Sequence, residues 1–413
     1  MNDAYDIIVV GAGIVGVSTA LHLQQRGRRV LLLDKQEPGR ETSFGNSGNI
    51  ESSYVLPFTP PAFSKIPGIL LGNSASARMS YPSGLKFIPW VCDFYLKSRT
   101  ETRIKNGHAL RPLIAPSVEE HKKLMQGTDA AKYFHTTGRV KIHRSQASFQ
   151  SAALERDVAR EEGVPFEVLG VEAFREREPH IRPVFYKAVC WTGSARLSDP
   201  GAVVVLYAGK FTAAGGTFKA DPVKAVAKAA GGWHVQCAGQ GYAANDVVVC
   251  AGPWSPTLLK PLGYNPPLGL KRGYHRHFTA AEGKLSHNIT DADAGYVMSP
   301  MEQGIRIATG AEFASLDAPA NDVQISQVLP HARELFPLGE AVEKQSWMGS
   351  RPCFTDSLPA IGMVKGQKGL WVNIGHGHSG LTIGPSSGRL IAEMMTGDKP
   401  FCDPTPYSPM RFV

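Results

Sequence analysis

The sequence predicts an α/β domain with a Rossmann-like parallel sheet, interleaved with an α+β domain that is built on an antiparallel sheet. Three observations carry this prediction. A buried strand, a glycine-rich turn and a helix follow one another near the N-terminus, and the same order returns at residues 370–395. Between them, residues 268–312 alternate apolar and polar side chains. Continuous apolar runs are typical of parallel strands, and alternation is typical of antiparallel ones.

The N-terminal pattern has the spacing of a dinucleotide-binding turn. The apolar strand 7–10 leads into Gly11, Gly13 and Gly16. In this arrangement Gly11 allows the tight turn, Gly13 lets the backbone approach a pyrophosphate, and Gly16 lets the next helix pack closely on the sheet. That helix, expected over residues 14–26, presents its free N–H groups and its positive dipole end to the phosphates.

An acidic residue completes this pattern. Gly27 ends the helix, and the second strand, residues 29–33, leads to Asp34, whose carboxylate can accept hydrogen bonds from a ribose hydroxyl. An ordinary strand–helix–strand unit with a tight turn is the alternative, and the agreement of all these elements favours the dinucleotide site. The pattern by itself leaves NAD and FAD open.

Composition sets further bounds. The chain has 413 residues, of which 43% are hydrophobic and 19% charged, as in a globular protein of about two domains. The net charge of +8 is scattered, so we expect no nucleic-acid partner. A basic field could instead steer an anionic substrate or touch an anionic membrane surface, although a merely solvated surface is the simpler interpretation.

The six cysteines form no CxxC pair and no metal-ligand spacing, so we expect no metal site. The first strand begins almost at the N-terminus, which leaves no room for a signal peptide. No apolar run reaches the ~18 residues of a membrane span. We therefore expect a cytoplasmic protein that could associate with the inner face of a membrane.

The order of the predicted elements indicates that both domains are discontinuous. Further helices are expected at 84–99, 110–126, 146–162, 200–214, 326–335 and 385–395, and Asp199 is the expected N-cap of the fourth. The first domain is expected to comprise residues 1–50, 146–180, 199–262 and 345–413. The second is expected to comprise residues 51–145, 181–198 and 263–344.

Four motifs extend the pattern along the chain: ETSFGNSG at 41–48, VVVCAGPWS at 247–255, RPCFTDSLPAIG at 351–362 and GHGHSGLT at 375–382. In order and spacing they resemble the glutathione-reductase-type flavoproteins of the D-amino-acid oxidase and dehydrogenase branch. The chain is similar to the small subunit of D-amino-acid dehydrogenase and to glycine oxidase. One departure lies at Thr355-Asp356-Ser357, where the family motif reads TPD and the usual proline is missing.

The resemblance implies an FAD-binding domain and a substrate domain. It also implies FAD rather than NAD, because the later motifs add contacts for an extended flavin dinucleotide. Relatives that tether the flavin use a cysteine in this C-terminal region; Cys353 is interpreted as a packing residue, so the FAD is expected to be non-covalent. The expected cofactor-binding residues are Gly11, Gly13, Ile14, Val15, Gly16, Asp34, Lys35, Thr42, Ser43, Asn46, Ser47, Gly48, Val223, Gly252, Trp254, Arg351, Gly375, His376, Gly377, His378, Gly380, Leu381 and Thr382.

The substrate residues are inferred from the same resemblance. Arg351 is expected to bind a carboxylate, because a guanidinium can hold both of its oxygens. Tyr296 matches the tyrosine of a family strand that assists carboxylate binding, with a core tyrosine as an equal alternative. Tyr274 and His275 are expected in the substrate sheet, and Tyr54 as a cap on the pocket. No catalytic base is named.

The implied reaction is oxidative deamination of an amino or imino acid, of the D-amino-acid or D-proline kind. A hydride passes from Cα to flavin N5, and the resulting imine hydrolyses to a 2-oxo acid. The electron acceptor could be O2, a quinone or a partner flavoprotein. The alternatives are a glycine- or sarcosine-type secondary amine oxidase, the FAD subunit of a hetero-oligomeric dehydrogenase, and a non-catalytic flavoprotein.

Overall fold

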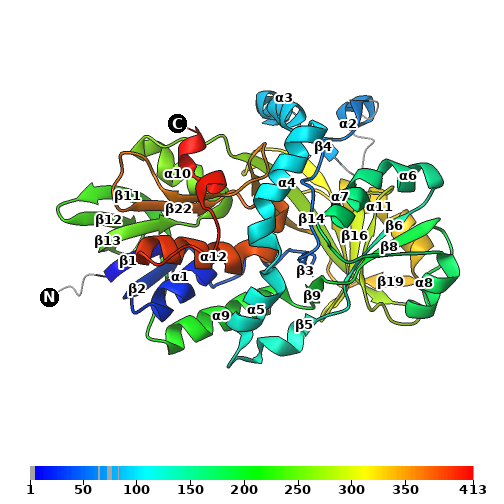
Figure 1. Ribbon diagram of the computed structural model, residues 1–413, viewed down its shortest axis with the longest axis horizontal. Helices are drawn as coiled ribbons and strands as arrows, with labels where there is room; N and C mark the ends of the chain where they lie inside the picture. The colour runs from blue at the N-terminus through cyan, green and yellow to red at the C-terminus, as the bar shows by residue number, and fades with distance from the viewer. Residues whose placement is uncertain (1–4, 64–65, 72–76, 82, 413) are drawn as a thin grey trace.

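The computed structural model describes residues 5–63, 66–71, 77–81 and 83–412. Its two parts lie side by side, each around its own sheet (Figure 1). The part on the left of Figure 1 contains both the first strand and the last long helix of the chain. The two ends of the sequence therefore build one part together, as the repeated strand–turn–helix pattern predicts.

The first sheet has eight strands with a parallel centre. The parallel strands are, in spatial order, β10 (Thr217–Ala220), β2 (Val30–Asp34), β1 (Tyr5–Val10), β13 (Gly241–Val249) and β22 (Leu370–Ile374). Antiparallel partners extend the sheet, namely β11 (Val223–Ala229), β12 (Gly232–Cys237) and β21 (Ala360–Met363). The long apolar strands β1 and β2 are buried along most of their length, as expected of a covered parallel sheet.

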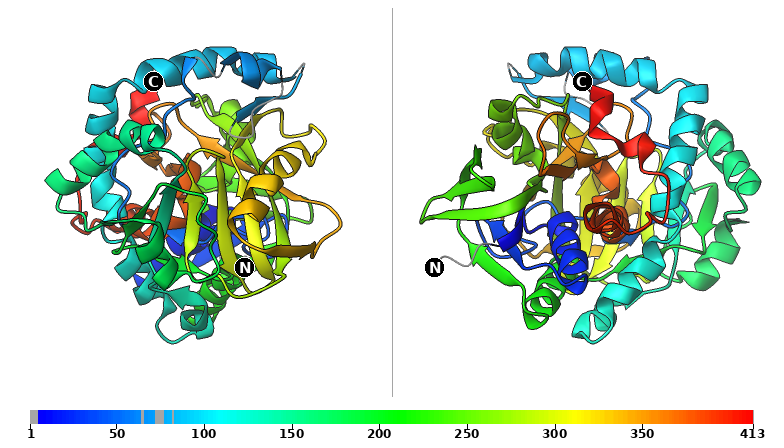
Figure 2. Two further views of the ribbon diagram at one scale, coloured as in Figure 1. Left: turned by 90° about the vertical axis from the view of Figure 1, so that its right-hand side faces the viewer. Right: turned by 60° about the vertical axis from the view of Figure 1, so that its left-hand side comes forward.

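Two helices with small residues cover this sheet. Helix α1 (Ile14–Gln25) packs against α12 (Gly380–Thr396), and the right view of Figure 2 shows them next to each other. A Cβ atom at Gly388 would lie 2.8 Å from the backbone of Ser18. This close contact joins the C-terminal segment to the N-terminal turn. Helix α9 (Pro200–Ala213) also packs on α1 and begins, as predicted, at the cap Asp199, which accepts a hydrogen bond from the N–H of Ala202 at 2.9 Å.

The second sheet has eleven strands and is mixed. Its order is β4 (Ala77–Met79), β18 (Ala311–Phe313), β14 (Gly269–Ala280), β17 (Gly304–Thr309), β16 (Tyr296–Met301), β15 (Asn288–Asp291), β6 (Arg139–His143), β8 (Lys187–Trp191) and β7 (Glu167–Leu169), with β19 (Leu338–Ala341) and β20 (Trp347–Cys353) also paired to β14. The strands β14 to β15 are antiparallel as predicted, whereas β15–β6 and β18–β4 are parallel. Helix α11 (Val323–Leu335) packs on this sheet.

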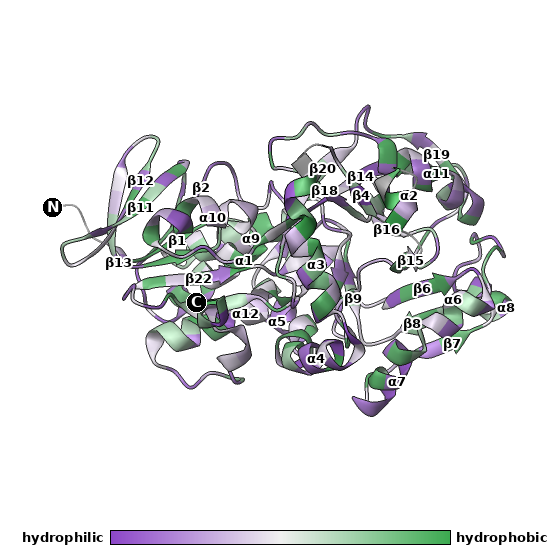
Figure 3. Ribbon diagram, turned by 90° about the horizontal axis from the view of Figure 1, so that it is seen from above, coloured by the Kyte–Doolittle hydropathy of each residue, from purple (hydrophilic) through white to green (hydrophobic). Residues whose placement is uncertain are grey.

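A three-stranded sheet of β3 (Asn49–Ile50), β9 (Ala195–Leu197) and β5 (Phe134–His135) is also present. Helix α3 (Ile88–Lys97) crosses the junction of the two parts when the molecule is seen from above (Figure 3). Its residue Phe94 is buried and lines the cavity described below.

The segment 146–180 lies with the second sheet, and not with the first as the expected division has it. Strand β7 pairs with β8. Helix α7 (Ala153–Glu161) buries Val158 in a cluster that contains Val189 and Trp191 of β8. The helical pattern of this segment did not reveal which sheet its apolar face would cover.

Several predicted helix boundaries are wrong, and two of them differ from the structure by five residues or more. The expected helix 110–126 is two helices, α4 (Thr100–Ile114) and α5 (Ser117–Met125), and the expected start of α12 at Pro385 is five residues late. Proline lacks an N–H group, so Pro385 cannot bond to the carbonyl of Leu381. The ring of His121 bonds to that carbonyl instead, at 2.8 Å, which lets the helix run through the proline.

Candidate functional site

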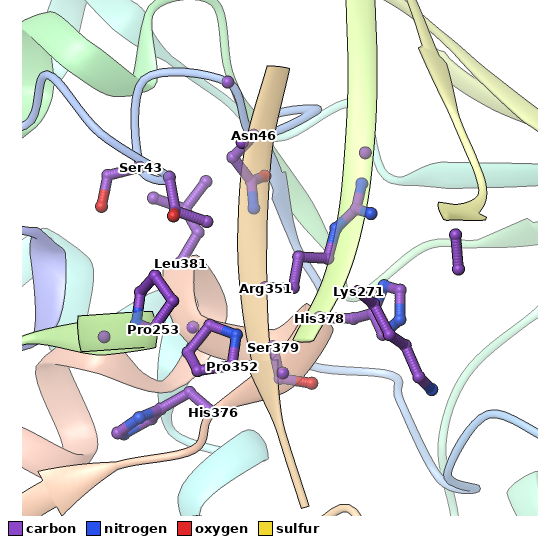
Figure 4. A pocket seen from close by; sticks show the side chains of 18 of the residues that line it. Ser43, Asn46, Pro253, Lys271, Arg351, Pro352, His376, His378, Ser379 and Leu381 are labelled. Atoms are coloured by element: carbon purple, nitrogen blue, oxygen red, sulfur yellow. The ribbon is translucent and has the colours of Figure 1, made fainter. Parts of the chain in front are cut away.

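One cavity of about 1120 Å3 extends between the two parts. It begins at the turn after β1, follows residues 41–49, passes the turn before α12 and reaches Arg351 in β20 (Figure 4). Ligand pockets commonly have volumes of about 300–1,000 Å3. This cavity is larger, so it has room for a long dinucleotide and a small second molecule.

The glycine turn has the predicted shape at two of its three positions. Gly11 has φ +110°, and a Cβ atom there would lie 2.4 Å from the carbonyl oxygen of Cys250. At Gly16 a Cβ atom would lie 1.7 Å from the carbonyl oxygen of Gly11, so the helix can approach the turn only without a side chain. Gly13 lines the cavity, and its role toward a pyrophosphate stays a prediction.

Asp34 is held at the edge of the cavity by backbone amides. Its carboxylate accepts hydrogen bonds from the N–H groups of Ala12 at 2.5 Å and Lys35 at 2.6 Å. Burial raises the pKa of this carboxyl, and the amide donors oppose that shift. The Lys35 ammonium lies 3.6 Å from the ring centre of Trp254 and 2.6 Å from Glu41. These contacts fix the side chains at the end of the cavity where an adenosine would lie.

The segment 41–48 is fixed to both parts of the molecule. The Ser43 hydroxyl accepts a hydrogen bond from the N–H of Ile14 at 3.0 Å, at the start of α1. The Arg306 guanidinium in β17 donates to the carbonyls of Phe44, at 3.0 Å, and Asn46. The segment therefore spans from the glycine turn to the second sheet along the cavity.

Asn288 in β15 supports the same segment. It donates to the carbonyl of Ser47 at 2.8 Å and to the side chain of Asn49 at 2.7 Å. Sequence reasoning missed Asn288 and Arg306. A charged residue inside the apolar run GIRIAT was the available signal, because a fully buried arginine needs partners. Arg306 is buried, and burial lowers its pKa to about 10.

The turn before α12 presents backbone and uncharged imidazoles to the cavity. His376 bonds to the Ser387 hydroxyl at 3.0 Å, and burial lowers its pKa to about 3. Burial and the nearby cations Arg351 and Lys271 lower the pKa of His378 well below its usual value. Neither histidine carries charge near neutral pH. The N-terminal dipole of α12 is therefore the main positive feature of this turn.

Thr382 and Arg351 also line the cavity. Thr382 accepts from the N–H of Glu51 at 3.2 Å and so joins α12 to the segment after β3. Arg351 donates to the carbonyls of Gly310 at 3.0 Å and Thr309 at 3.4 Å. No carboxylate of the described residues lies within ion-pair distance of its guanidinium, and burial lowers its pKa. Within the described part of the chain, the cation faces the cavity without an anionic partner.

Lys271 in β14 is a further cavity residue that sequence reasoning did not single out. It is directly opposite Arg351 across the β14–β20 pair. Its side chain is buried, and its ammonium lies 4.0 Å from the ring centre of Phe94 and 5.0 Å from that of Trp90. A lysine two residues before a glycine in a predicted strand does not by itself indicate a residue that faces a cavity.

The predicted tyrosines lie beside the cavity with their hydroxyl groups already bonded. The Tyr274 hydroxyl donates to Glu312 at 2.5 Å, and the Tyr296 hydroxyl donates to the carbonyl of His331 at 3.4 Å. Both side chains belong to the core of the second sheet. A direct bond from either hydroxyl to a ligand would require one of these contacts to be replaced, so their substrate role stays a prediction.

His275 and Tyr54 are placed differently. His275 is not among the residues that line the cavity; it stacks on Trp347 with ring centres 4.9 Å apart, and burial lowers its pKa to about 2. Tyr54 lines a small adjoining pocket, where its hydroxyl accepts from the N–H of Phe58 at 3.0 Å. Phe58 in turn packs on His378 with ring centres 4.6 Å apart. Through Phe58, Tyr54 thus supports the wall of the main cavity near His378.

The cradle fits a flavin dinucleotide. It offers a turn that side chains would fill, two helix N-termini aimed at one cavity, and a carboxylate at the adenosine end. The other predicted cofactor residues that line it are Ile14, Val15, Thr42, Asn46, Ser47, Val223, Gly252, Gly375, Gly377, Gly380 and Leu381. Gly48 does not line the cavity but turns the segment 41–48 with φ +79°. Over the described ranges, no cluster of His, Cys, Asp and Glu could hold a metal ion.

Comparisons with known proteins agree with this geometry. A family model described as "FAD dependent oxidoreductase" (DAO) matches residues 6–394. The chain is 30% identical to a D-amino-acid oxidase of Bradyrhizobium diazoefficiens, over the whole of both chains. It is 29% identical to a D-amino acid dehydrogenase of Rhizobium johnstonii, over 96% of this chain and 97% of the other.

Solved structures share the fold at lower identity. Glycine oxidase from Geobacillus kaustophilus superposes with a TM-score of 0.75 at 21% identity, covering 99% of each chain. L-proline dehydrogenase from P. horikoshii superposes with a TM-score of 0.76 at 18% identity, covering 100% of this chain and 98% of the other. In the described part of the molecule, no helix is both long and apolar enough to span a bilayer.

Proposed function

Because the chain belongs to the DAO family of FAD-dependent oxidoreductases, we propose that it oxidises a D-amino acid or a D-proline-like imino acid to the corresponding imine. The imine then hydrolyses to a 2-oxo acid. The family supplies FAD and chemistry at an amino group. The choice of the D-series rests on the two curated relatives, whose names specify D-amino acids.

The observation that carries this proposal is the position of Arg351. It places a cation without a carboxylate partner in the same cavity as the glycine turn and the start of α12. An amino acid presents a carboxylate, and a guanidinium can bind both of its oxygens. The bonds to the carbonyls of Gly310 and Thr309 hold the guanidinium in place before a substrate arrives.

The chain's own part in the reaction is orientation. Bound FAD would supply the hydride acceptor for the Cα–H bond of the substrate. Arg351 would fix the carboxylate, and the segment 41–48 with the turn 375–382 would hold the flavin edge, so that Cα lies at a constant position. His376 and His378 are uncharged at neutral pH, and neither is assigned as a base.

We infer non-covalent FAD from the position of Cys353. Its thiol is buried, and burial raises its pKa, whereas a nucleophilic thiolate needs a lowered one. The thiol lies 3.6 Å from the carbonyl of Arg351 in its own strand. Denaturation of the holoenzyme in acid should therefore release all the flavin into the supernatant.

The test is anaerobic titration of the holoenzyme with single amino acids. Loss of the flavin absorbance with D-amino acids or D-proline, and not with their L-isomers, is the expected result. Reduction by glycine or sarcosine alone would favour the secondary amine oxidase, and flavin that stays oxidised with every compound would refute the proposed activity. In air, hydrogen peroxide from the pure chain would indicate O2 as acceptor, and activity only with dyes or a quinone would indicate a dehydrogenase.

A further inference from the structure

We propose that Lys271 forms a second anion subsite, so that the preferred substrate carries a second carboxylate in addition to the one at Cα. This inference rests on the proposed function and narrows its substrate class to acidic amino or imino acids. Lys271 and Arg351 are the two cations that lie opposite each other on the wall of the cavity.

The two side chains share one face of the sheet. Residues directly opposite in an antiparallel pair have Cβ atoms about 4.5–5.5 Å apart and point to the same side. From there the cationic ends diverge. The Arg351 guanidinium lies over Gly273, where a Cβ atom would be 2.2 Å from its Nη1, and the Lys271 ammonium lies over Phe94. Figure 4 shows the two groups pointing in different directions.

The carboxylates that line the cavity do not neutralise either cation. Glu41 pairs with Lys35 at 2.6 Å, Glu51 lies 3.6 Å from Arg139, and Asp291 pairs with Arg144 at 2.8 Å. Asp34 is bonded by backbone amides. Among the described residues, the lining cations without a carboxylate at ion-pair distance are Lys271, Arg351 and the exposed Lys224.

Burying a charge costs free energy unless an opposite charge or hydrogen bonds compensate it. Lys271 is only 6% exposed, and its contacts are aromatic rings, which hold a cation weakly. A monocarboxylate bound to Arg351 would leave this charge uncompensated. A substrate with two carboxylates and a neutral amine carries two negative charges, which match the two cations in number.

The subsite can be tested by binding, without turnover. Succinate and succinamate have nearly the same size and differ in one charge. Titration calorimetry of the oxidised holoenzyme should give succinate a Kd at least about 10-fold lower, because a hydrogen bond to a charged group contributes more than a neutral one. Lys271→Met should remove this preference, Lys271→Arg should retain most of it, and Lys86→Met, which removes an exposed charge elsewhere, should leave it unchanged.

Equal affinity for the two compounds in the wild-type protein would overturn the proposal, and this comparison needs no variant. An equal loss of both affinities in Lys271→Met would also overturn it, because Lys271 would then support the first carboxylate or the fold. In turnover, kcat/KM for D-aspartate over D-asparagine should exceed 1 in the wild type and fall about 10-fold in Lys271→Met. If no amino acid reduces the flavin, the proposed activity fails while the binding comparison still decides the subsite.

Discussion

Replacing Arg351 tests the substrate site most directly. Arg351→Ala removes a guanidinium that is anchored on two carbonyls and has no carboxylate partner in the described chain. A hydrogen bond to a charged group contributes about 1.5–3 kcal/mol, which corresponds to roughly 10- to 150-fold in affinity. Because the pair would form in a largely desolvated cavity and could be bidentate, we expect the KM to rise ~100-fold or more.

The assay has to separate binding from folding, since the carbonyls of Gly310 and Thr309 lose a donor in the same variant. The FAD content and the melting temperature are therefore measured first, and Arg351→Lys serves as the charged control. The lysine should recover part of the affinity but not the bidentate geometry. An unchanged KM for the true substrate in a fully FAD-loaded Arg351→Ala protein would refute the assignment.

Three further predictions follow from the packing of the cradle. Gly16→Ala should abolish FAD retention and lower the melting temperature, because its Cβ would lie 1.7 Å from the carbonyl oxygen of Gly11. The control is Gly209→Ala in α9, whose Cβ would contact nothing within 4 Å and which should be neutral or slightly stabilising. Equal behaviour of the two variants would contradict this reasoning. Arg306→Met should weaken FAD binding at least ~10-fold in equilibrium dialysis, since two carbonyls of the segment 41–48 lose their charged donor, and Arg306→Lys should recover part of it; full affinity in Arg306→Met would rule out this support. Stability should be greatest above pH 6.5 and fall as the pH drops toward about 4, because buried neutral histidines have lowered pKa values and the unfolded chain takes up the protons first. Each of these histidines should lower the free energy of unfolding by roughly 1 kcal/mol at pH 5.5. A melting temperature that stays constant from pH 7.5 to 5 would argue against this pH dependence. The histidines concerned are His22, His121, His143, His275 and His376.

Local patterns predicted several turns and caps of the first part of the molecule correctly, for a physical reason. The turn at Gly11 and Gly16, the cap at Asp199 and the stop at Gly27 each depend on a backbone conformation or a contact within a short segment. Such requirements restrict the residue type directly, so they are visible in the sequence. The boundary at Pro385 was missed because its missing hydrogen bond is replaced by His121, 260 residues away from the carbonyl that it bonds.

The wall that carries the proposed substrate site could not be predicted in the same way. Its side chains come from β14 and β20, which lie about 80 residues apart in the chain and meet through pairing in the second sheet. Nothing local distinguishes Lys271, which faces the cavity, from the neighbouring Arg272, which is fully buried beside Glu312 on the other face. The facing of a strand residue follows from its register, and a shift of one residue would exchange these two cations.

The same register explains why the hydroxyl group of Tyr274, a predicted substrate residue, is already bonded in the core. Tyr274 belongs to the face of β14 that carries Arg272, and its hydroxyl is bonded to Glu312 in the core. The opposite face carries Lys271 and Gly273, and the absence of a side chain at Gly273 gives the Arg351 guanidinium its space. A Cβ atom at Gly273 would displace the guanidinium from this position, so the proposed carboxylate site needs the glycine as well as the cation. In the proposed substrate site, recognition therefore depends on one alternation along β14, which places Lys271 and the small residue Gly273 on the face that also holds the Arg351 guanidinium.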